Sequence, residues 1–175
     1  EGFFILSKNA QNLGAGDNKV YTRNGSFQPD SSNKYIVDSQ GRKLFGFPTD
    51  TAGNVLSLGL EPIETKGFVD YKFTDDGFLV ADPDSDSPTV LYQVGLTTFQ
   101  NKQGLVYTAG TAFEATVAAG ERIKDGRPGE QLSEGSVSSF GSIQAGFVEN
   151  ANIDIAKVAL DMSLLNRSFT AVQAV

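Results

Sequence analysis

The chain contains no cysteine and no histidine, and these two absences narrow its possible chemistry before any motif is considered. Without cysteine there is no disulfide framework, thiol nucleophile, thiolate metal site or iron–sulfur cluster. Without histidine, the commonest general base and transition-metal ligand is also missing. Hydrolysis would have to rely on paired carboxylates, a serine–lysine dyad or a bound cation. The sequence therefore favours a protein that is not an enzyme and needs no cofactor.

The balance of charge and the lengths of the apolar runs bear on partners and location. The formal net charge of −7 would repel a phosphate backbone, so nucleic acid is not an expected partner. No run approaches the roughly 18 to 20 apolar residues that span a bilayer, and residues 1–6 lack the basic start of a cleaved signal. We expect no membrane insertion. Because the chain opens without methionine and stops inside an expected helix, we expect flanking sequence at both ends.

Short apolar or alternating runs, separated by turn residues, occupy most of the chain and predict an antiparallel, mainly β domain. The expected strands cover residues 3–7, 20–23, 26–27, 35–37, 43–47, 69–73, 78–81, 90–99 and 105–107, with a possible strand at 55–60. Asn24-Gly25 and the turn at 39–41 predict two successive hairpins, and residues 75–77 predict a third. Residues 120–139, rich in glycine, serine and charge, are interpreted mostly as an extended connector.

The apolar periodicity becomes helical after Asn152, which can cap a helix with Asp154 in its first turn. Apolar residues then recur at alternating spacings of three and four, the seam of a coiled coil. The seam consists of Ile155, Val158, Met162, Leu165, Phe169 and Val172. The sequence offers no second long amphipathic helix to cover it. We expect a helical partner outside this segment, and packing onto the β domain is the alternative.

Two regions follow from these patterns. Residues 1–142 are expected to form a β-rich core domain, in which 48–89 are a variable insert or hairpin region. Residues 143–175 are expected to form a connector and an amphipathic α-helix. Large aromatic residues on strand faces, such as Phe27 and Phe99, are expected in the core of the β domain.

The acidic stretch after residue 81 is the main candidate for a metal site. Asp82, Asp84 and Asp86 resemble the first half of a calcium loop, but Ser87 stands where that loop needs glycine and Gln93 where it needs glutamate. A solvated acidic loop is the favoured interpretation. The sequence therefore predicts no metal-binding residue.

Other possible functional motifs have simpler explanations. Asp75 and Asp76 could be cast as an acid–base pair, but a hairpin turn requires them there, and adjacent strand residues point to opposite faces. Residues 14–16 and 126–129 lack the full pattern of a nucleotide-binding loop. No catalytic or cofactor-binding residue is predicted.

Four strings, in this order, resemble the bacterial flagellar hook and distal rod proteins. They are YTRNGSFQPD at 21–30, YIVDSQGRKLFG at 35–46, LTTFQNKQGL at 96–105 and GSIQAGFVENANID at 141–154. The opening Gly2-Phe3-Phe4 and the helical stretch 162–169 are also similar to that family. The resemblance covers roughly residues 1–47 and 90–175. It departs at Asn33-Lys34, where a glycine is usual, and at Asn166, where a glutamine is usual.

The resemblance implies an antiparallel β domain of hook and rod type with a C-terminal helix. It also implies a subunit exported by the flagellar type III apparatus without a cleaved signal, which polymerises into a helical tube transmitting torque from basal body to filament. Its partners would be copies of itself and neighbouring axial proteins. In this family the terminal helices pair as an inner tube inside a β shell, so an N-terminal helix would precede Glu1. Residues 48–90 are too short for the large outer domain of hook proteins, which favours a rod-type protein, a short hook variant or a trimmed form.

Two other functions are compatible with the residues. A secreted β-rich fibre, phage-tail or adhesive protein could use the same helix to trimerise, and a surface carbohydrate-binding module belongs with this group. A hydrolase acting through carboxylates alone would need a cleft with two acids about 5–9.5 Å apart.

Overall fold

The fold is described from a computed structural model, and the description covers residues 2–8, 19–120, 122–131 and 139–144. The strands are β1 (Phe3–Ser7), β2 (Lys19–Thr22), β3 (Gln28–Pro29), β4 (Ile36–Val37), β5 (Phe45–Pro48), β6 (Glu61–Pro62), β7 (Tyr71–Phe73), β8 (Phe78–Ala81), β9 (Thr89–Val94), β10 (Leu96–Phe99), β11 (Leu105–Tyr107), β12 (Ala112–Ala115) and β13 (Arg122–Gly126). Two 3-10 turns, η1 (Lys102–Gly104) and η2 (Val117–Ala119), are the helical elements of this part. None of its helices has the length and apolar character to cross a membrane.

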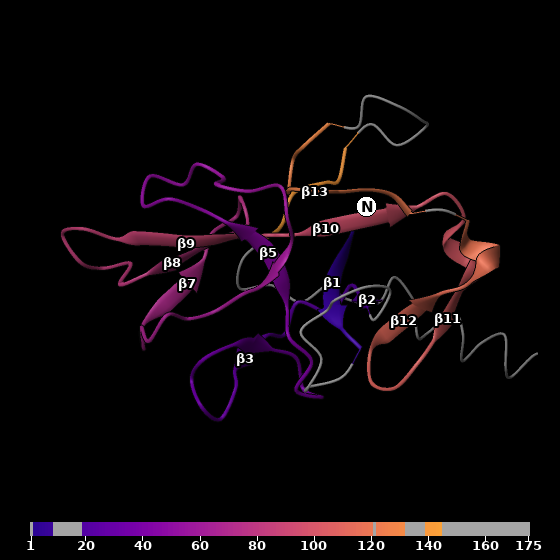
Figure 1. Cartoon of the computed structure of the whole chain (residues 1–175), viewed down its shortest axis with the longest axis horizontal. Helices are drawn as coiled ribbons and strands as arrows, with labels where there is room; N and C mark the ends of the chain where they lie inside the picture. The colour runs from indigo at the N-terminus through magenta and orange to yellow at the C-terminus, as the bar shows by residue number, and fades with distance from the viewer. Residues whose placement is uncertain (1, 9–18, 121, 132–138, 145–175) are drawn as a thin grey trace, which may run out of the picture.

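All strand pairs are antiparallel and form two main sheets, which confirms the predicted β class (Figure 1). The six-stranded sheet has the order β11-β12-β2-β1-β10-β13, and the five-stranded sheet has the order β6-β5-β9-β8-β7. The short strands β3 and β4 pair with each other. Residues Leu6 and Leu44 form a bridge between β1 and the chain entering β5, so the sheets are also joined by main-chain contact.

The run predicted as one strand over 90–99 is in fact two strands, one in each sheet. β9 and β10 follow each other along the long axis of Figure 1 and are separated by Gly95. Its amide donates a hydrogen bond of 3.0 Å to the carbonyl of Phe45. A Cβ at this position would lie 2.5 Å from Leu60 Cδ2 and 3.3 Å from the Phe45 carbonyl, so only glycine fits without a shift. The periodicity of the run could not reveal this crossing, because both strands are buried throughout their adjoining ends.

The hydrophobic core is shared by the two sheets. One cluster of buried residues includes Leu6 and Leu96 from the six-stranded sheet together with Leu79 and Leu91 from the five-stranded sheet. A second, more aromatic cluster contains Phe3, Phe45, Phe99 and Tyr21. Because each cluster draws residues from both sheets, burial of apolar surface stabilises the sheets as one body.

The predicted aromatic core is confirmed for one residue and is only partial for the other. Phe99 is 2% exposed, and its ring makes edge contacts with Tyr21 at 4.8 Å and Phe3 at 6.0 Å between centroids. Phe27 is half-buried, and its ring meets Phe4 at 5.1 Å. Edge-to-face pairs of this kind contribute beyond their buried area.

The hairpin predicted at Asn24-Gly25 is not formed. β2 pairs with β1 and β12, whereas β3 pairs with β4, so the chain leaves one sheet at this dipeptide. Asn24 makes a local turn instead, in which its Oδ1 accepts a 3.0 Å hydrogen bond from the amide of Ser26. The side chain competes with strand pairing here, as asparagine often does. The other two predicted turns are present, at Val37 opposite Lys43 and between β7 and β8.

Three other predictions need correction. The possible strand at 55–60 is an irregular loop that makes one bridge, between Thr49 and Val55. β12 was not predicted, and β13 lies inside the region interpreted as a connector. β13 is recruited by pairing with β10, a long-range contact that overrides its weak local pattern. Of the predicted connector and helix at 143–175, residues 145–175 lie outside the described residues.

Candidate assembly surface

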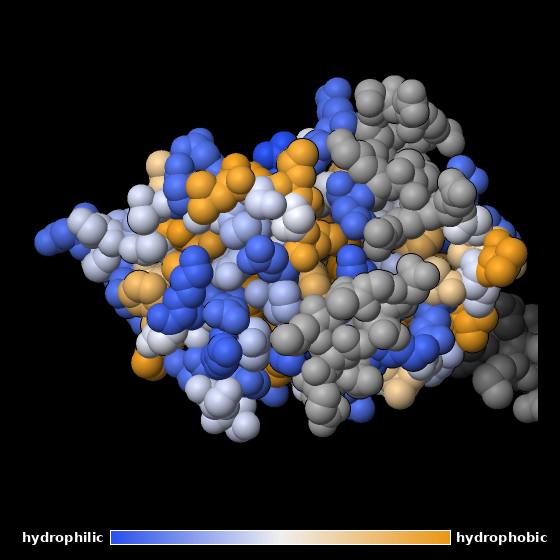
Figure 2. Space-filling model, in the orientation of Figure 1, coloured by the Kyte–Doolittle hydropathy of each residue, from blue (hydrophilic) through white to orange (hydrophobic). Residues whose placement is uncertain are grey.

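Large exposed apolar side chains gather at two places on the described surface. The first place has Leu56 (68% exposed) and Leu58 (84%) on the loop after β5, and the second has Val106 (55%) and Tyr107 (64%) on β11 with Val117 (100%) on η2. Val69 (83%), before β7, belongs to neither place. In Figure 2, hydrophobic surface is visible over the loop after β5 and at the far right, where Figure 1 shows η2. Single exposed apolar residues are ordinary, but clusters of them mark interaction sites.

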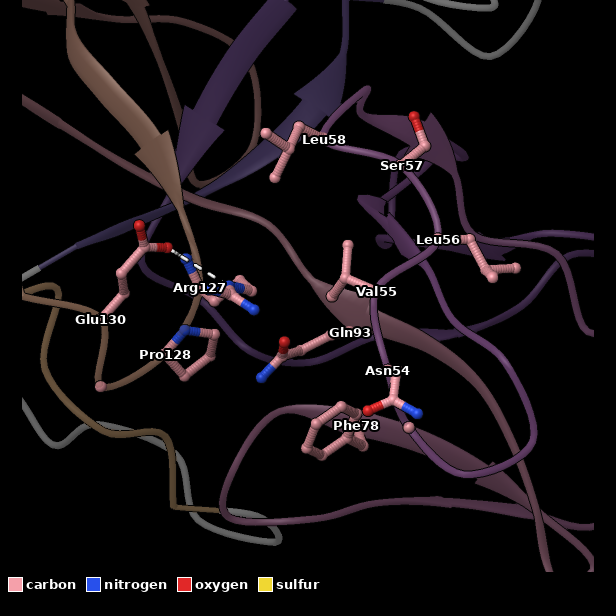
Figure 3. A pocket seen from close by; sticks show the side chains of 12 residues that line it. Asn54, Val55, Leu56, Ser57, Leu58, Phe78, Gln93, Arg127, Pro128 and Glu130 are labelled. Carbon is pink, nitrogen blue, oxygen red and sulfur yellow. Dashed lines mark hydrogen bonds and ion pairs between the residues drawn. The ribbon is translucent and has the colours of Figure 1, made fainter.

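The first place is the rim of a pocket of about 580 Å³. Loop 53–58 forms one wall, and the turn 127–130 after β13 forms the other (Figure 3). Phe78 and Gln93, from β8 and β9, line the space between the walls. Figure 3 shows Val55 and Leu58 pointing towards the turn, and Leu56 pointing away. The pocket therefore has an apolar wall and lies where the two sheets meet.

A polar turn holds the first wall in place. Asp50 Oδ1 accepts hydrogen bonds from the amides of Ala52 (3.0 Å) and Asn54 (2.8 Å), and its Oδ2 accepts one from Asn54 Nδ2 (2.9 Å). The Asn54 side chain and amide lower the pKa of Asp50 against the opposing effect of desolvation. A carboxylate thus fixes the start of the loop that presents Leu56 and Leu58.

The second wall is held by a local ion pair and a main-chain bridge. Arg127 Nε lies 3.3 Å from Glu130 Oε2, which also accepts a 3.1 Å hydrogen bond from the Arg127 amide. The Gly129 amide donates to the carbonyl of Gly141 at 2.7 Å. Both charges of this wall are paired with each other, so the pocket presents little net charge from its own lining.

The acidic residues considered as catalytic or metal-binding candidates lie in exposed turns and loops of the described part of the chain. The Gln93 amide donates 3.1 Å to the carbonyl of Asp76, and Asp75 and Asp76 sit in the β7–β8 turn with exposed side chains. Asp82, Asp84 and Asp86 are likewise exposed. Among the residues the structure describes, no group of three or more histidine, cysteine, aspartate or glutamate residues could hold a metal ion.

The second apolar place is the hairpin tip, defined as η1, β11, β12 and η2. Asn101 and Thr116 connect η1 to η2, at the end of the hairpin opposite the β11–β12 turn. Asn101 Nδ2 donates to the carbonyl of Ala118 at 2.9 Å, and the Thr116 hydroxyl donates to the carbonyl of Gly104 at 2.6 Å. A Cβ on Gly104 would collide with the backbone of Ala118 and Ala119, so the two 3-10 turns pack in direct contact. These contacts hold the two 3-10 turns against each other.

The hairpin tip is also anchored in the core. Ala119 is fully buried in the aromatic cluster, while Val117, two residues earlier, is fully exposed. The Tyr107 ring contacts Phe113 at 6.0 Å, and Phe113 contacts Phe3 at 6.1 Å, again edge to face. These contacts lead from the surface of the tip to the centre of the six-stranded sheet.

A buried ion pair connects the turn between β11 and β12 to the chain before β5. The Arg42 guanidinium binds Asp38 Oδ2, with Nε at 2.8 Å and Nη2 at 2.6 Å, and Nη1 donates to the carbonyl of Ala109 at 3.0 Å. Both side chains are less than one-tenth exposed. The string at 35–46 that carries the resemblance therefore has a structural role. Sequence reasoning missed this pair, although a carboxylate four residues before an arginine across a tight turn was a usable signal.

The six seam residues predicted as an interface, from Ile155 to Val172, all lie outside the described residues. The structure therefore leaves that interface as a prediction. The surface it does describe offers the pocket and the hairpin tip, neither of which was predicted. The pocket and the hairpin tip are defined by the side chains that stay exposed once the chain has folded. Local periodicity in the sequence does not report that exposure.

Comparison with known proteins gives relatives of one kind, although no protein-family model matches. The chain is 31% identical over 153 residues to the flagellar basal-body rod protein FlgG of Borreliella burgdorferi, covering 86% of this chain and 49% of that protein. It is 26% identical over 153 residues to FlgG of Buchnera aphidicola subsp. Acyrthosiphon pisum, covering 87% and 50%. It is 24% identical over 118 residues to the flagellar hook protein FlgE of Escherichia coli, covering 67% and 27%. The chain spans about half the length of these rod relatives, and its similarity to the rod protein FlgG and the hook protein FlgE supports a place among the flagellar axial proteins.

Proposed function

We propose that this chain is a structural subunit of the bacterial flagellar rod or hook and has no catalytic role. Copies of it, with neighbouring axial proteins, polymerise into a helical tube that transmits torque from the basal body to the filament. The observation that carries the proposal is the match to a named rod protein over 86% of the chain, which extends through both sheets. Head-to-tail contacts between identical subunits produce open helical polymers of this kind.

The architecture suits a subunit under load. A torque-bearing subunit must pass force between its contacts without bending internally. Here β9 continues into β10 through Gly95, and both core clusters span the two sheets. Arg42 is buried in an ion pair and also binds the turn between β11 and β12. Close-packed interiors of this type have low compressibility and transmit strain.

A rod-type subunit is the more specific proposal. Matches to rod proteins cover 86% and 87% of the chain, whereas matches to hook proteins cover 62% to 67%. Residues 48–90 supply only β6, β7, β8 and part of β9. That length forms the two edges of the small five-stranded sheet and leaves little chain for a large outer domain.

We propose that residues 1–142 form the outer β domain and 143–175 the connector and inner helix. The seam of Ile155, Val158, Met162, Leu165, Phe169 and Val172 would pair with a second helix in the tube. Replacing Leu165 with aspartate should abolish polymers while the β domain melts at an unchanged temperature. A loss of β-domain stability in that variant would show that the helix packs on the domain instead.

We propose that the protein reaches the flagellum through the type III apparatus without a cleaved signal. The proposal is tested by deleting the gene in its source bacterium. Deletion should give non-motile cells whose basal bodies lack the structures beyond this subunit, and the wild-type gene should restore them. Deleted cells that build a complete rod, hook and filament would contradict the proposed function.

A further inference from the structure

We propose that the hairpin tip of one copy docks into the pocket of the next copy, with Val117 inserted between loop 53–58 and the turn 127–130. The contact is head-to-tail, because it joins two different surfaces of the same chain. It rests on the proposed function of a self-polymerising subunit, and it names the two faces that meet on the β domain.

The tip has the properties of an inserted group. Val117 is fully exposed, yet it is held at the outer end of a turn whose next residues are fixed. The amides of Ala119 and Gly120 donate to the carbonyls of Thr116 and Val117 at 3.0 and 3.2 Å. Little conformational freedom would be lost when such a side chain becomes buried, so its burial contributes efficiently to binding.

The pocket has the complementary properties. Its apolar wall includes Val55 and Leu58, and Leu58 is 84% exposed when the pocket is empty. Across from them, Pro128 continues the apolar lining, while Arg127 is already paired with Glu130. A valine entering this space would meet Val55 and Leu58 on one side and Pro128 on the other, with the polar side chains of Asn54, Ser57 and Gln93 also in the lining. The charged pair Arg127–Glu130 is already formed. The volume of about 580 Å³ is ample for the valine side chain and its neighbouring alanine.

The position of the two surfaces makes a second copy the matching occupant. The hairpin tip lies at one end of the long axis in Figure 1, and loop 53–58 lies beyond the six-stranded sheet, towards the other end. Within one copy, the tip therefore lies away from its own pocket. When the tip of each copy fills the pocket of the next, one tip and one pocket remain free at the ends, so the assembly stays open.

The distribution of charge disfavours the symmetric alternative. Residues 48–90 contain nine acidic and two basic residues, a formal charge of −7, which equals that of the whole chain. A contact between two pockets would bring two such regions together. Residues 101–119 contain only Lys102 and Glu114, so the tip is neutral in total. Docking the neutral tip against the acidic region avoids the repulsion between like-charged faces.

The test uses engineered disulfides. Because the chain has no cysteine of its own, every disulfide must form between introduced cysteines. A Val117→Cys/Leu58→Cys double variant, oxidised at high concentration, should give a ladder of covalent multimers on a non-reducing gel. The matched control is Val117→Cys/Val69→Cys, because Val69 is almost as exposed as Leu58 but lies away from the pocket. We expect roughly tenfold more multimer from the first pair than from the second.

Three results would overturn the contact. Equal yields from the two pairs would mean random collision. Efficient dimers from Val117→Cys alone would mean a symmetric tip-to-tip contact. Slow maleimide labelling of Leu58→Cys in the dilute monomer would mean that the chain's own residues cover the pocket.

A substitution without cross-linking completes the test. Val117→Asp should weaken self-association roughly tenfold with an unchanged melting temperature, whereas Val69→Asp should leave both unchanged. Electron microscopy of the same proteins separates this contact from the proposed function. Tubes formed without the Val117–Leu58 cross-link would refute the contact and keep the function. Cross-links without tubes would keep the contact and count against the function, and the absence of both would refute both.

Discussion

The six-stranded sheet and the region 48–90 differ in burial and in charge. In the six-stranded sheet, β1 and β10 are buried over nearly their whole length. In the region 48–90, the edge strands β6 and β7 are short and half-exposed, and the nine acidic residues give a formal charge of −7. The strings that resemble the hook and rod family lie outside this region. The first part is a well-buried body, and the second is an acidic surface built on it.

This difference predicts where substitutions should leave the fold intact. The five-stranded sheet is joined to the body by β5 and β9, whose inner ends are buried, whereas its far side consists of exposed turns. Changes in those turns alter the surface that neighbours meet. Changes at the joint alter the body itself. Substitutions should therefore have graded effects according to their distance from the joint.

The largest effect should come from Phe99→Ala in the aromatic cluster. Removing this ring leaves a cavity beside Tyr21 and Phe3, and the free energy of unfolding should fall by about 3–5 kcal/mol. Phe73→Ala, in the edge strand β7, removes a partly buried ring and should cost less than about 2 kcal/mol. Urea unfolding of both variants measures the difference. Equal losses would contradict the distinction between body and surface.

The buried ion pair should rank next. Arg42→Ala leaves the Asp38 carboxylate buried without its cation, and we expect a loss of about 3 kcal/mol. The exposed pair between Lys8 Nζ and Glu114 Oε1, at 3.0 Å, is the matched control, and Lys8→Ala should cost less than about 1 kcal/mol. Thermal unfolding checks both. If Arg42→Ala were as mild as Lys8→Ala, the hairpin tip would not depend on this pair.

A smaller effect should follow from Gly95→Ala at the crossing between the sheets. The added methyl would press on Leu60 and the Phe45 carbonyl, and we expect a loss of about 2 kcal/mol from overpacking. At Gly25 a Cβ meets only Phe4, at 3.8 Å, so Gly25→Ala should be close to neutral. Unfolding midpoints compare the two. A neutral Gly95→Ala would mean that the joint is looser than its contacts indicate.

The smallest effect should appear in acid. The pKa of Asp50 is lowered by its hydrogen bonds from Asn54, so the folded state binds fewer protons at this site than the unfolded chain. Its stabilising contribution is present above the ordinary carboxyl pKa of about 3.9 and is lost as pH falls through the lowered value. Asp50→Asn should flatten part of the fall in melting temperature below about pH 4. An unchanged acid profile would show that the turn does not depend on the carboxylate.

The sequence predicted the parts of the fold that depend on local patterns. Alternating apolar residues and turn residues located β1, the β7–β8 hairpin and the core position of Phe99. Long-range pairing decided the rest. Asn24-Gly25 has the composition of a hairpin, but β2 finds its partners in β1 and β12, and β13 has little local pattern until it pairs with β10. The pocket and the hairpin tip arise from exposure after folding, which periodicity does not report.

The most direct test of the account is negative-stain electron microscopy of the protein, together with any sequence that flanks it in its gene, concentrated at near-neutral pH. The account predicts ordered helical tubes from the wild type and none from the seam variant Leu165→Asp. Discrete trimers would indicate a fibre or adhesive protein instead. Monomers at every concentration would contradict the central claim that this chain is a self-assembling axial subunit.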